Sequence, residues 1–263
     1  MSRVPDAATP RWLLVPASLG LAFVGVPLIA LLVRLPWRDL PGLLAGTGAR
    51  DALWLSLRTC LASTLLSLIL GVPLAVLLSR LTGRRAAVVR TVSVLPMVLP
   101  PVVAGLVLLI TLGRRGLIGQ YLSVFGIDIG FTTTAVVLAQ TFVSMPYLVV
   151  TVESALRATD HDLEVVAATL GAGPSTVLRR VTLPLVLPAL VGGTTVAFAR
   201  ALGEFGATLT FAGSLQGTTR TLPLEIYLQR ETDTNEALAL SVVLIAVASV
   251  LMVLPSLLGR RSR

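Results

Sequence analysis

Six long apolar runs constrain this chain more than any other feature of its sequence. They cover residues 12–33, 52–79, 88–112, 133–152, 186–207 and 237–258. Each run is near or above the ~20 residues that an α-helix needs to cross the hydrocarbon core of a bilayer. With 55% hydrophobic and 13% charged residues, the chain has too much apolar surface for one soluble core. The sequence therefore predicts an all-α, polytopic membrane helix bundle with about six transmembrane helices.

The first run is predicted to be a helix of the mature protein. It is too long for the apolar region of a signal peptide and lacks an evident cleavage site. The predicted organisation has three parts: residues 1–51, with one transmembrane helix and the first external loop; residues 52–258, the helical core with a polar loop at 155–184; and residues 259–263, a basic tail.

Arginine placement predicts the orientation, because short cytoplasmic loops retain positive charge during insertion. An even number of spans puts both ends of the chain on one side of the membrane. Twelve arginines then share that side: Arg3, Arg11, Arg80, Arg84, Arg85, Arg90, Arg157, Arg179, Arg180, Arg260, Arg261 and Arg263. Seven lie on the opposite side: Arg34, Arg38, Arg50, Arg114, Arg115, Arg220 and Arg230. The excess predicts that both termini and the loop at 155–184 are cytoplasmic.

Residue counts argue against several activities. The chain has no lysine, so it cannot contain a G-x-x-x-x-G-K-[ST] P-loop and is not predicted to hydrolyse ATP. Its only cysteine, Cys60, cannot form an intrachain disulfide, and its only histidine, His161, lacks the further ligands of a metal site. We expect no catalytic residues, no metal and no cofactor. The arginines are dispersed among apolar runs, which argues against nucleic acid binding.

A polar segment rich in small residues, 160–184, interrupts the apolar runs on the predicted cytoplasmic side. Its first part, 160–172, is predicted to form a short helix. Asp160 or Asp162 caps the start of this helix, and Gly171 or Gly173 ends it.

Small residues share faces of this short helix at i,i+4 spacing. Ala167 pairs with Gly171, and Ala168 with Ala172. Such a low-profile surface suits insertion into the cleft of a soluble motor protein. An ordinary solvated loop is the alternative interpretation.

Four ionisable residues lie within or near the apolar runs: Arg58, Glu153, Arg200 and Glu204. Charges at membrane depth usually face a cavity or one another. Arg200 and Glu204 are four residues apart, so they either pair on one helix face or contact a transported substrate. Arg58 either snorkels or pairs, or it lines a pathway.

Three prolines interrupt the third run within LPMVLPPVVAG, residues 95–105: Pro96, Pro100 and Pro101. Each removes a backbone donor and disturbs the preceding helical turn. A helix break at membrane depth is tolerated beside neighbouring helices or a water-filled cavity, as in transport pathways. A merely structural kink is the alternative.

The segment 160–184 resembles the EAA motif of importer-type ABC transporter permeases, which reads Glu-Ala-Ala, three residues, Gly, nine residues, Ile, one residue, Leu-Pro. With Gly171 as the motif glycine, its conserved positions fall on Ala167, Val181, Leu183 and Pro184. The match departs at the start, where Val165 and Val166 replace Glu and the first Ala. Glu164 precedes that position by one residue. The resemblance assigns contact with an ATPase to Glu164, Ala167, Ala168, Gly171, Val181, Leu183 and Pro184.

A second stretch, FARALGEFGATLTFAGSLQGTTRTLPLEIY at 198–227, is similar to molybdate permeases, as are LPMVLPPVVAG and GFTTTAVVLAQ. Sulfate and tungstate permeases are close relatives and remain alternatives. The resemblance implies a type I importer fold in a bacterial cell membrane, surrounded by lipid. It also implies a homodimer, two copies of a P-loop ATPase and an extracytoplasmic oxyanion-binding protein. Arg58, Pro100, Pro101, Arg200 and Glu204 are the candidate pathway residues.

Two other classes of protein remain open from the residues themselves. An ion-gradient-driven secondary transporter or channel needs no ATPase, and the EAA-like loop argues against it. An intramembrane enzyme needs a nucleophile with its base, or metal ligands, at membrane depth, and the sequence has neither pattern.

Overall fold

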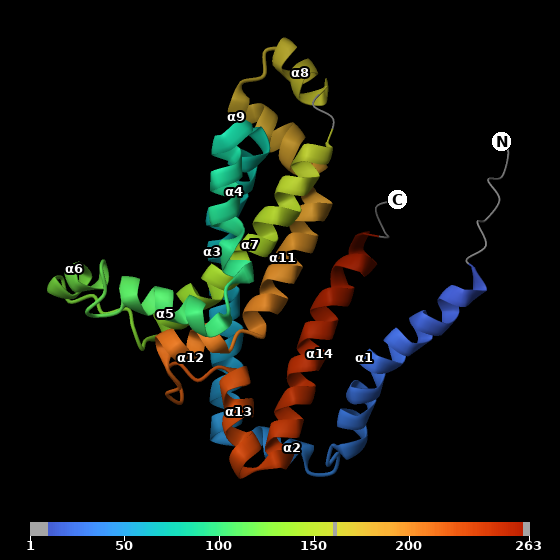
Figure 1. The fold of residues 1–263 in the computed structure, drawn as a ribbon, viewed down its shortest axis with the longest axis vertical. Coiled ribbons are helices and arrows are strands. Elements are labelled where there is room, and N and C mark those ends of the chain that lie inside the picture. The colour runs from blue at the N-terminus through green and yellow to red at the C-terminus, as the bar shows by residue number, and fades with distance from the viewer. Residues whose placement is uncertain (1–9, 160–161, 260–263) are drawn as a thin grey trace.

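The computed structural model describes residues 10–159 and 162–259, and every regular element within them is helical. The chain runs through η1 (Arg11–Leu13), α1 (Leu14–Arg34), α2 (Leu40–Ala45), α3 (Thr47–Arg80), α4 (Gly83–Val98), α5 (Pro101–Leu112), α6 (Gly119–Val124), α7 (Thr133–Ala158), α8 (Asp162–Thr169), α9 (Pro174–Val177), the π-helical turn η2 (Leu178–Thr182), α10 (Leu183–Leu185), α11 (Leu187–Leu202), α12 (Gly206–Ala212), α13 (Leu222–Thr232) and α14 (Thr234–Gly259). Figure 1 shows this course.

Four described helices are long and apolar enough to cross a membrane: α1, α3, α7 and α14. Two bent pairs bring the number of candidate spans to as many as six. These pairs are α4 with α5, bent by 116°, and Pro174–Leu185 with α11, bent by 71°. The polytopic all-α prediction is thus confirmed, with four unbroken candidate spans and up to two bent ones. Because α3 begins at Thr47, the predicted division after residue 51 falls inside this helix.

The bend between α4 and α5 lies at the predicted proline break. α4 ends at Val98, Pro100 is the N-cap of α5, and Pro101 is its first residue. Proline suits the first turn of a helix, where its missing N–H would have no partner. Pro96 instead stays inside α4.

The apolar run 186–207 does not form one continuous helix, contrary to the prediction of a single span. α11 ends at Leu202, and α12 begins at Gly206 after a break. The carboxylate of Glu204 accepts a hydrogen bond from the backbone N–H of Ala207, 2.8 Å away. Because this N–H has no partner within its own first turn, the side chain favours a new helix start at this point.

The core forms where α3, α7 and α11 pack against one another. Small residues cover the buried face of α3: Ala52, Ser56, Cys60, Ser63, Ser67, Gly71 and Ala75. A Cβ atom at Gly71 would lie 3.1 Å from the Cγ atom of Met145, so the α3 backbone comes close to α7 there. Small residues allow this close packing between helices in a membrane.

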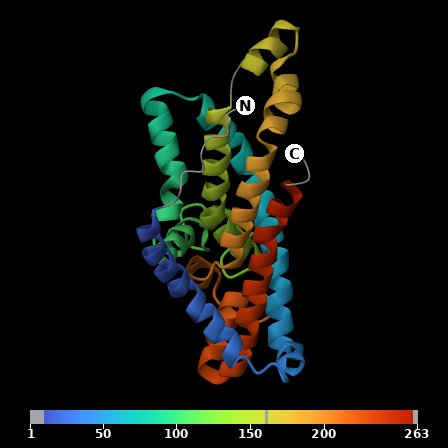
Figure 2. The same ribbon diagram turned by 90° about the vertical axis from the view of Figure 1, so that its right-hand side faces the viewer.

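Different elements lie at the two ends of the bundle. α8 and the turn between α3 and α4 lie at one end, and α2 and α13 lie at the other (Figures 1 and 2). The start of α1 and the end of α14 both point toward the α8 end. α1 has no buried residue, and Phe23 is 83% exposed. Arg3, Asp160, His161 and residues 260–263 of the predicted basic tail lie outside the described residues.

Candidate functional site

The predicted short helix in the polar segment is α8, Asp162–Thr169. Asp162 and Glu164 lie in its first turn, where negative charge is favourable to the helix dipole. Gly171 follows its end with φ +86°, a backbone conformation that glycine adopts without strain. The N–H groups of Gly171 and Ala172 donate to the carbonyls of Ala168 and Ala167, each at 3.0 Å. Gly171, rather than Gly173, therefore ends the helix.

No residue of α8 is buried, and several of the exposed side chains of this helix and of the residue after it are apolar. Leu170 is 83% exposed, and Leu163, Val165 and Val166 are more than half exposed. These side chains extend beyond the small residues Ala167 and Ala168, so the surface is less smooth than its alanines predict.

A groove of about 420 Å³ separates α8 from the chain that returns to the bundle. The residues that line it come from both sides: Leu163, Val166, Ala167, Leu170, Arg180, Val181, Pro184 and Leu185. Ala167, Val181 and Pro184, three of the residues in the predicted ATPase contact, thus meet in one concave surface. Gly171 and Ala168 are exposed beside it, and Leu183 is half-buried.

Glu164 is turned toward the bundle. Its carboxylate accepts a hydrogen bond from the hydroxyl of Thr182, which is buried in η2. Both residues line a small space together with Arg80 and Thr159. Glu164 therefore attaches α8 to η2, an interaction that the motif alignment does not predict because Thr182 falls on one of its unspecified positions.

Four of the five candidate pathway residues, Pro100, Pro101, Arg200 and Glu204, lie at or beside the two helix breaks, which pack against each other. A Cβ atom at Gly206, the first residue of α12, would lie 2.7 Å from the Cβ atom of Pro101. A Cβ atom at Gly105 would lie 2.7 Å from the carbonyl oxygen of Ala207. The proline break and the glycine break thus form one joint between α5 and α12. Broken helices that contact each other are a common way to build a transport pathway.

Arg200 and Glu204 form the ion pair that their spacing allows, with 2.7 Å between Nη1 and Oε2. The Glu204 side chain is 1% exposed, and that of Arg200 is 27% exposed. Arg58 is exposed on α3 and forms no ion pair with any residue in the described part of the chain. The structure therefore pairs two of the three intramembrane candidates and leaves the third on the outer surface of the subunit.

A family model described as "Binding-protein-dependent transport system inner membrane component" matches residues 67–263, about three quarters of the chain. The chain belongs to this family. It is therefore a multi-pass inner-membrane component of a transport system that depends on a binding protein, and its fold is that of an ABC importer permease. The predictions of fold and of permease family are confirmed, whereas the roles of individual site residues remain predictions.

Curated relatives match nearly the whole length of this permease. The chain is 56% identical over 248 residues, 94% of each chain, to the "Molybdenum transport system permease protein ModB" of Mycobacterium bovis. It is 43% identical over 216 residues to the protein of the same name from Escherichia coli K12, covering 81% of this chain and 94% of that one. Among solved structures, a bacterial alginate ABC transporter in complex with its alginate pentasaccharide-bound periplasmic protein has a TM-score of 0.74 at 19% identity, covering 95% of this chain and 94% of that one.

Proposed function

We propose that this chain is the membrane-spanning subunit of an ATP-driven molybdate importer. The observation that supports the substrate best is the 56% identity, over 94% of both chains, to a molybdenum transport permease. The same name recurs at 43% identity in a second organism. Sulfate and tungstate remain the alternative anions. An ion-gradient-driven transporter is disfavoured, because the family match is to a binding-protein-dependent system.

We infer that α8 and the adjacent groove form the surface that the ATPase contacts. The proposed contact residues are Ala167, Ala168, Gly171, Val181, Leu183 and Pro184. Glu164 is proposed to support this surface by attaching α8 to η2 through its hydrogen bond with Thr182. The exposed apolar side chains of Leu163, Val166 and Leu170, which line the groove, support a protein contact, and α8 lies at the end of the bundle far from α2 and α13. Closure of two ATPase copies would move this surface and bias a bistable bundle.

The proposed assembly is a homodimer in a bacterial inner membrane, with one extracytoplasmic binding protein. The absence of any buried residue in α1 supports the homodimer, because a second copy could cover one face of this helix while lipid covers the rest. Both termini are proposed to be cytoplasmic, since the start of α1 and the end of α14 point toward α8. The proposed domain division keeps residues 52–258 as the permease core, with 155–184 as its coupling loop.

The proposed translocation pathway follows the joint between the two helix breaks. Pro100 and Pro101 lie on one side of this joint, and Arg200 and Glu204 precede the other. Arg58 is proposed to face the pathway or the second copy, because a charged side chain is costly against lipid tails. An oxyanion needs positive or polar surroundings only during passage, so tight capture is assigned to the binding protein.

The test is ATP-dependent uptake of labelled molybdate into proteoliposomes that contain this chain, its ATPase and its binding protein. We expect uptake that requires the ATPase and resists excess sulfate. Competition by tungstate then measures how well the transporter discriminates between molybdate and tungstate. Uptake abolished by sulfate would assign the chain to sulfate transport, and uphill uptake without the ATPase would overturn the proposal.

A further inference from the structure

A buried carboxylate joins two helices near α8, and one of its partners reaches a third. Glu153 lies on α7, and its side chain is only 5% exposed. It accepts a hydrogen bond from Arg90 on α4. It also accepts one from Arg157, one turn further along α7, with 2.9 Å between Nε and Oε1. A single carboxylate oxygen therefore receives donors from two helices.

Arg157 extends this connection to a third helix. Its Nη2 atom donates to the carbonyl oxygen of Leu78 at 2.6 Å and approaches that of Leu81 at 3.4 Å. α3 ends at Arg80, so the last carbonyls of this helix have no N–H partner within it. The guanidinium supplies that donor. We call the four residues Leu78, Arg90, Glu153 and Arg157 the Glu153 clasp.

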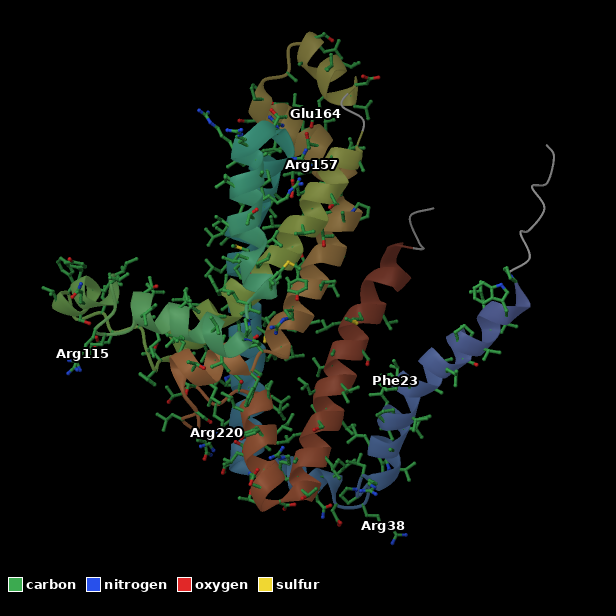
Figure 3. The ribbon with its side chains drawn as sticks, in the orientation of Figure 1. Phe23, Arg38, Arg115, Arg157, Glu164 and Arg220 are labelled. Carbon is green, nitrogen blue, oxygen red and sulfur yellow. The ribbon has the colours of Figure 1, made fainter. Side chains whose placement is uncertain are left out.

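The clasp lies near α8, because Glu164 shares a small space with Leu156 and Arg80, which neighbour the clasp residues on α7 and α3. α7 ends at Ala158, and α8 begins at Asp162. Arg157 and Glu164 lie at the same end of the molecule (Figure 3). α4 begins close to this end and continues to the proline break, where α5 packs on α12. The clasp thus connects α7 to the helix that leads to the proposed pathway joint.

Burial of the carboxylate makes the clasp sensitive to a change in charge. Removal of one partner from a buried ion pair leaves the others without compensation. Without the charge of Glu153, the guanidinium groups of Arg90 and Arg157 would repel each other across the α4–α7 contact. A movement of α8 driven by the ATPase would then move α7 without moving α4 and α3 by the same amount.

We propose that Glu153 is a positioning residue for energy coupling, and that it joins α3, α4 and α7 into the single body that α8 moves. The inference rests on the proposed function, since it assigns a role in ATP-driven transport. A purely stabilising ion pair would have a different signature. It would lower ATP hydrolysis and transport together, in proportion to the amount of folded complex.

The first test measures ATP hydrolysed and molybdate imported in the same proteoliposomes. We expect Glu153→Gln to lower the anion transported per ATP by at least about fivefold, the lower end of typical coupling between two sites. Arg90→Gln should lower this ratio less, because the bonds of Arg157 remain. Glu231→Gln is the matched control, since Glu231 pairs with Arg230 at an exposed site far from α8. It should leave the ratio at the wild-type value.

An unchanged ratio in both Glu153→Gln and Arg90→Gln would overturn the proposal, even if total activity falls. If Glu153→Gln does not assemble, the anion transported per ATP is compared between wild type and Arg90→Gln only. Arg90→Lys should then recover most of the wild-type ratio, because it restores the positive charge. Failure of the wild-type complex to import molybdate would instead refute the proposed function.

A distance measurement tests the clasp without reference to the transported anion. Spin labels at Val88→Cys and Ser154→Cys, which are exposed on α4 and α7, report the separation of these helices in a Cys60→Ser background. Labelled copies are diluted with unlabelled ones so that one copy of each complex carries the labels. We then expect one narrow distance distribution with and without trapped ATP in the complex of this chain and its ATPase. Glu153→Gln should broaden it. A distribution equally narrow in the variant would refute the clasp.

Discussion

Replacement of Gly171 by alanine should weaken the ATPase contact, whereas the same replacement at Gly173 should not. Gly171 has φ +86°, and Gly173 has φ −68° and ψ 160°, which any residue adopts readily. A Cβ atom at either position would meet no atom within 4 Å. The two variants therefore differ in backbone strain and not in steric contacts within the subunit.

The magnitude follows from the two backbone conformations. A non-glycine residue in the left-handed region costs about 1–2 kcal/mol. Alanine in place of glycine at a compatible position stabilises the folded chain by about 0.4–1 kcal/mol, because it restricts the unfolded chain. Both variants restrict the unfolded chain equally, so they should differ only by the strain at Gly171, about 1–2 kcal/mol in the free energy of the turn. Because α8 has no buried residue, core packing does little to offset this difference. A gap of about 1.4 kcal/mol already corresponds to a tenfold change in equilibrium constant.

The assay is titration of the ATPase against the permease in nanodiscs, combined with ATP-dependent uptake. We expect Gly171→Ala to bind the ATPase about 5- to 30-fold more weakly than Gly173→Ala, with equal amounts of both variants in the membrane. When the amount of ATPase is limiting, uptake should be lower with Gly171→Ala than with Gly173→Ala. Equal affinity of the two variants for the ATPase would refute the reasoning that the left-handed turn positions α8.

Two further predictions concern the joint between the helix breaks. Gly105→Ala should lower the temperature of half-unfolding in detergent, because its Cβ would lie 2.7 Å from the Ala207 carbonyl and overpacking costs about 1–3 kcal/mol. Gly192→Ala, with open space at that position, is the control, and a Gly105→Ala protein as stable as wild type would contradict the packing argument. Exchange of Arg200 and Glu204 should restore the ion pair but leave the N–H of Ala207 without its acceptor, at a cost of about 1–3 kcal/mol. Glu204→Gln, which keeps a carbonyl acceptor, should therefore give more monodisperse protein in size-exclusion chromatography than the exchange, and the reverse order would refute the capping role.

Local sequence signals predicted the elements that depend on backbone chemistry. Pro100 and Pro101 marked the bend between α4 and α5, because proline lacks an N–H group wherever it lies. The short helix α8 and its glycine end were also predictable, since a left-handed turn favours glycine whatever its surroundings. The resemblance to importer permeases rests on the same segments, and the family match confirms it.

Interactions between distant residues were not predictable in this way. The sequence shows Glu153 as one charge directly after an apolar run, but its partner Arg90 is 63 residues away. Likewise, Glu164 meets Thr182 only because η2 returns beside α8. The break after Leu202 was missed, because an apolar run reports hydrophobicity and not the hydrogen bond by which Glu204 starts a new helix.

The sequence by itself determined that this protein is a helical membrane protein, because hydrophobic length and proline or glycine chemistry act locally along the chain. It also determined the transporter family, since the segments that carry the resemblance are contiguous. Only the tertiary structure decided which charges are paired, which face of α8 is exposed, and that the two helix breaks meet. Those properties depend on how helices pack across large separations in sequence, where each contact is set by the shape and charge of both partners.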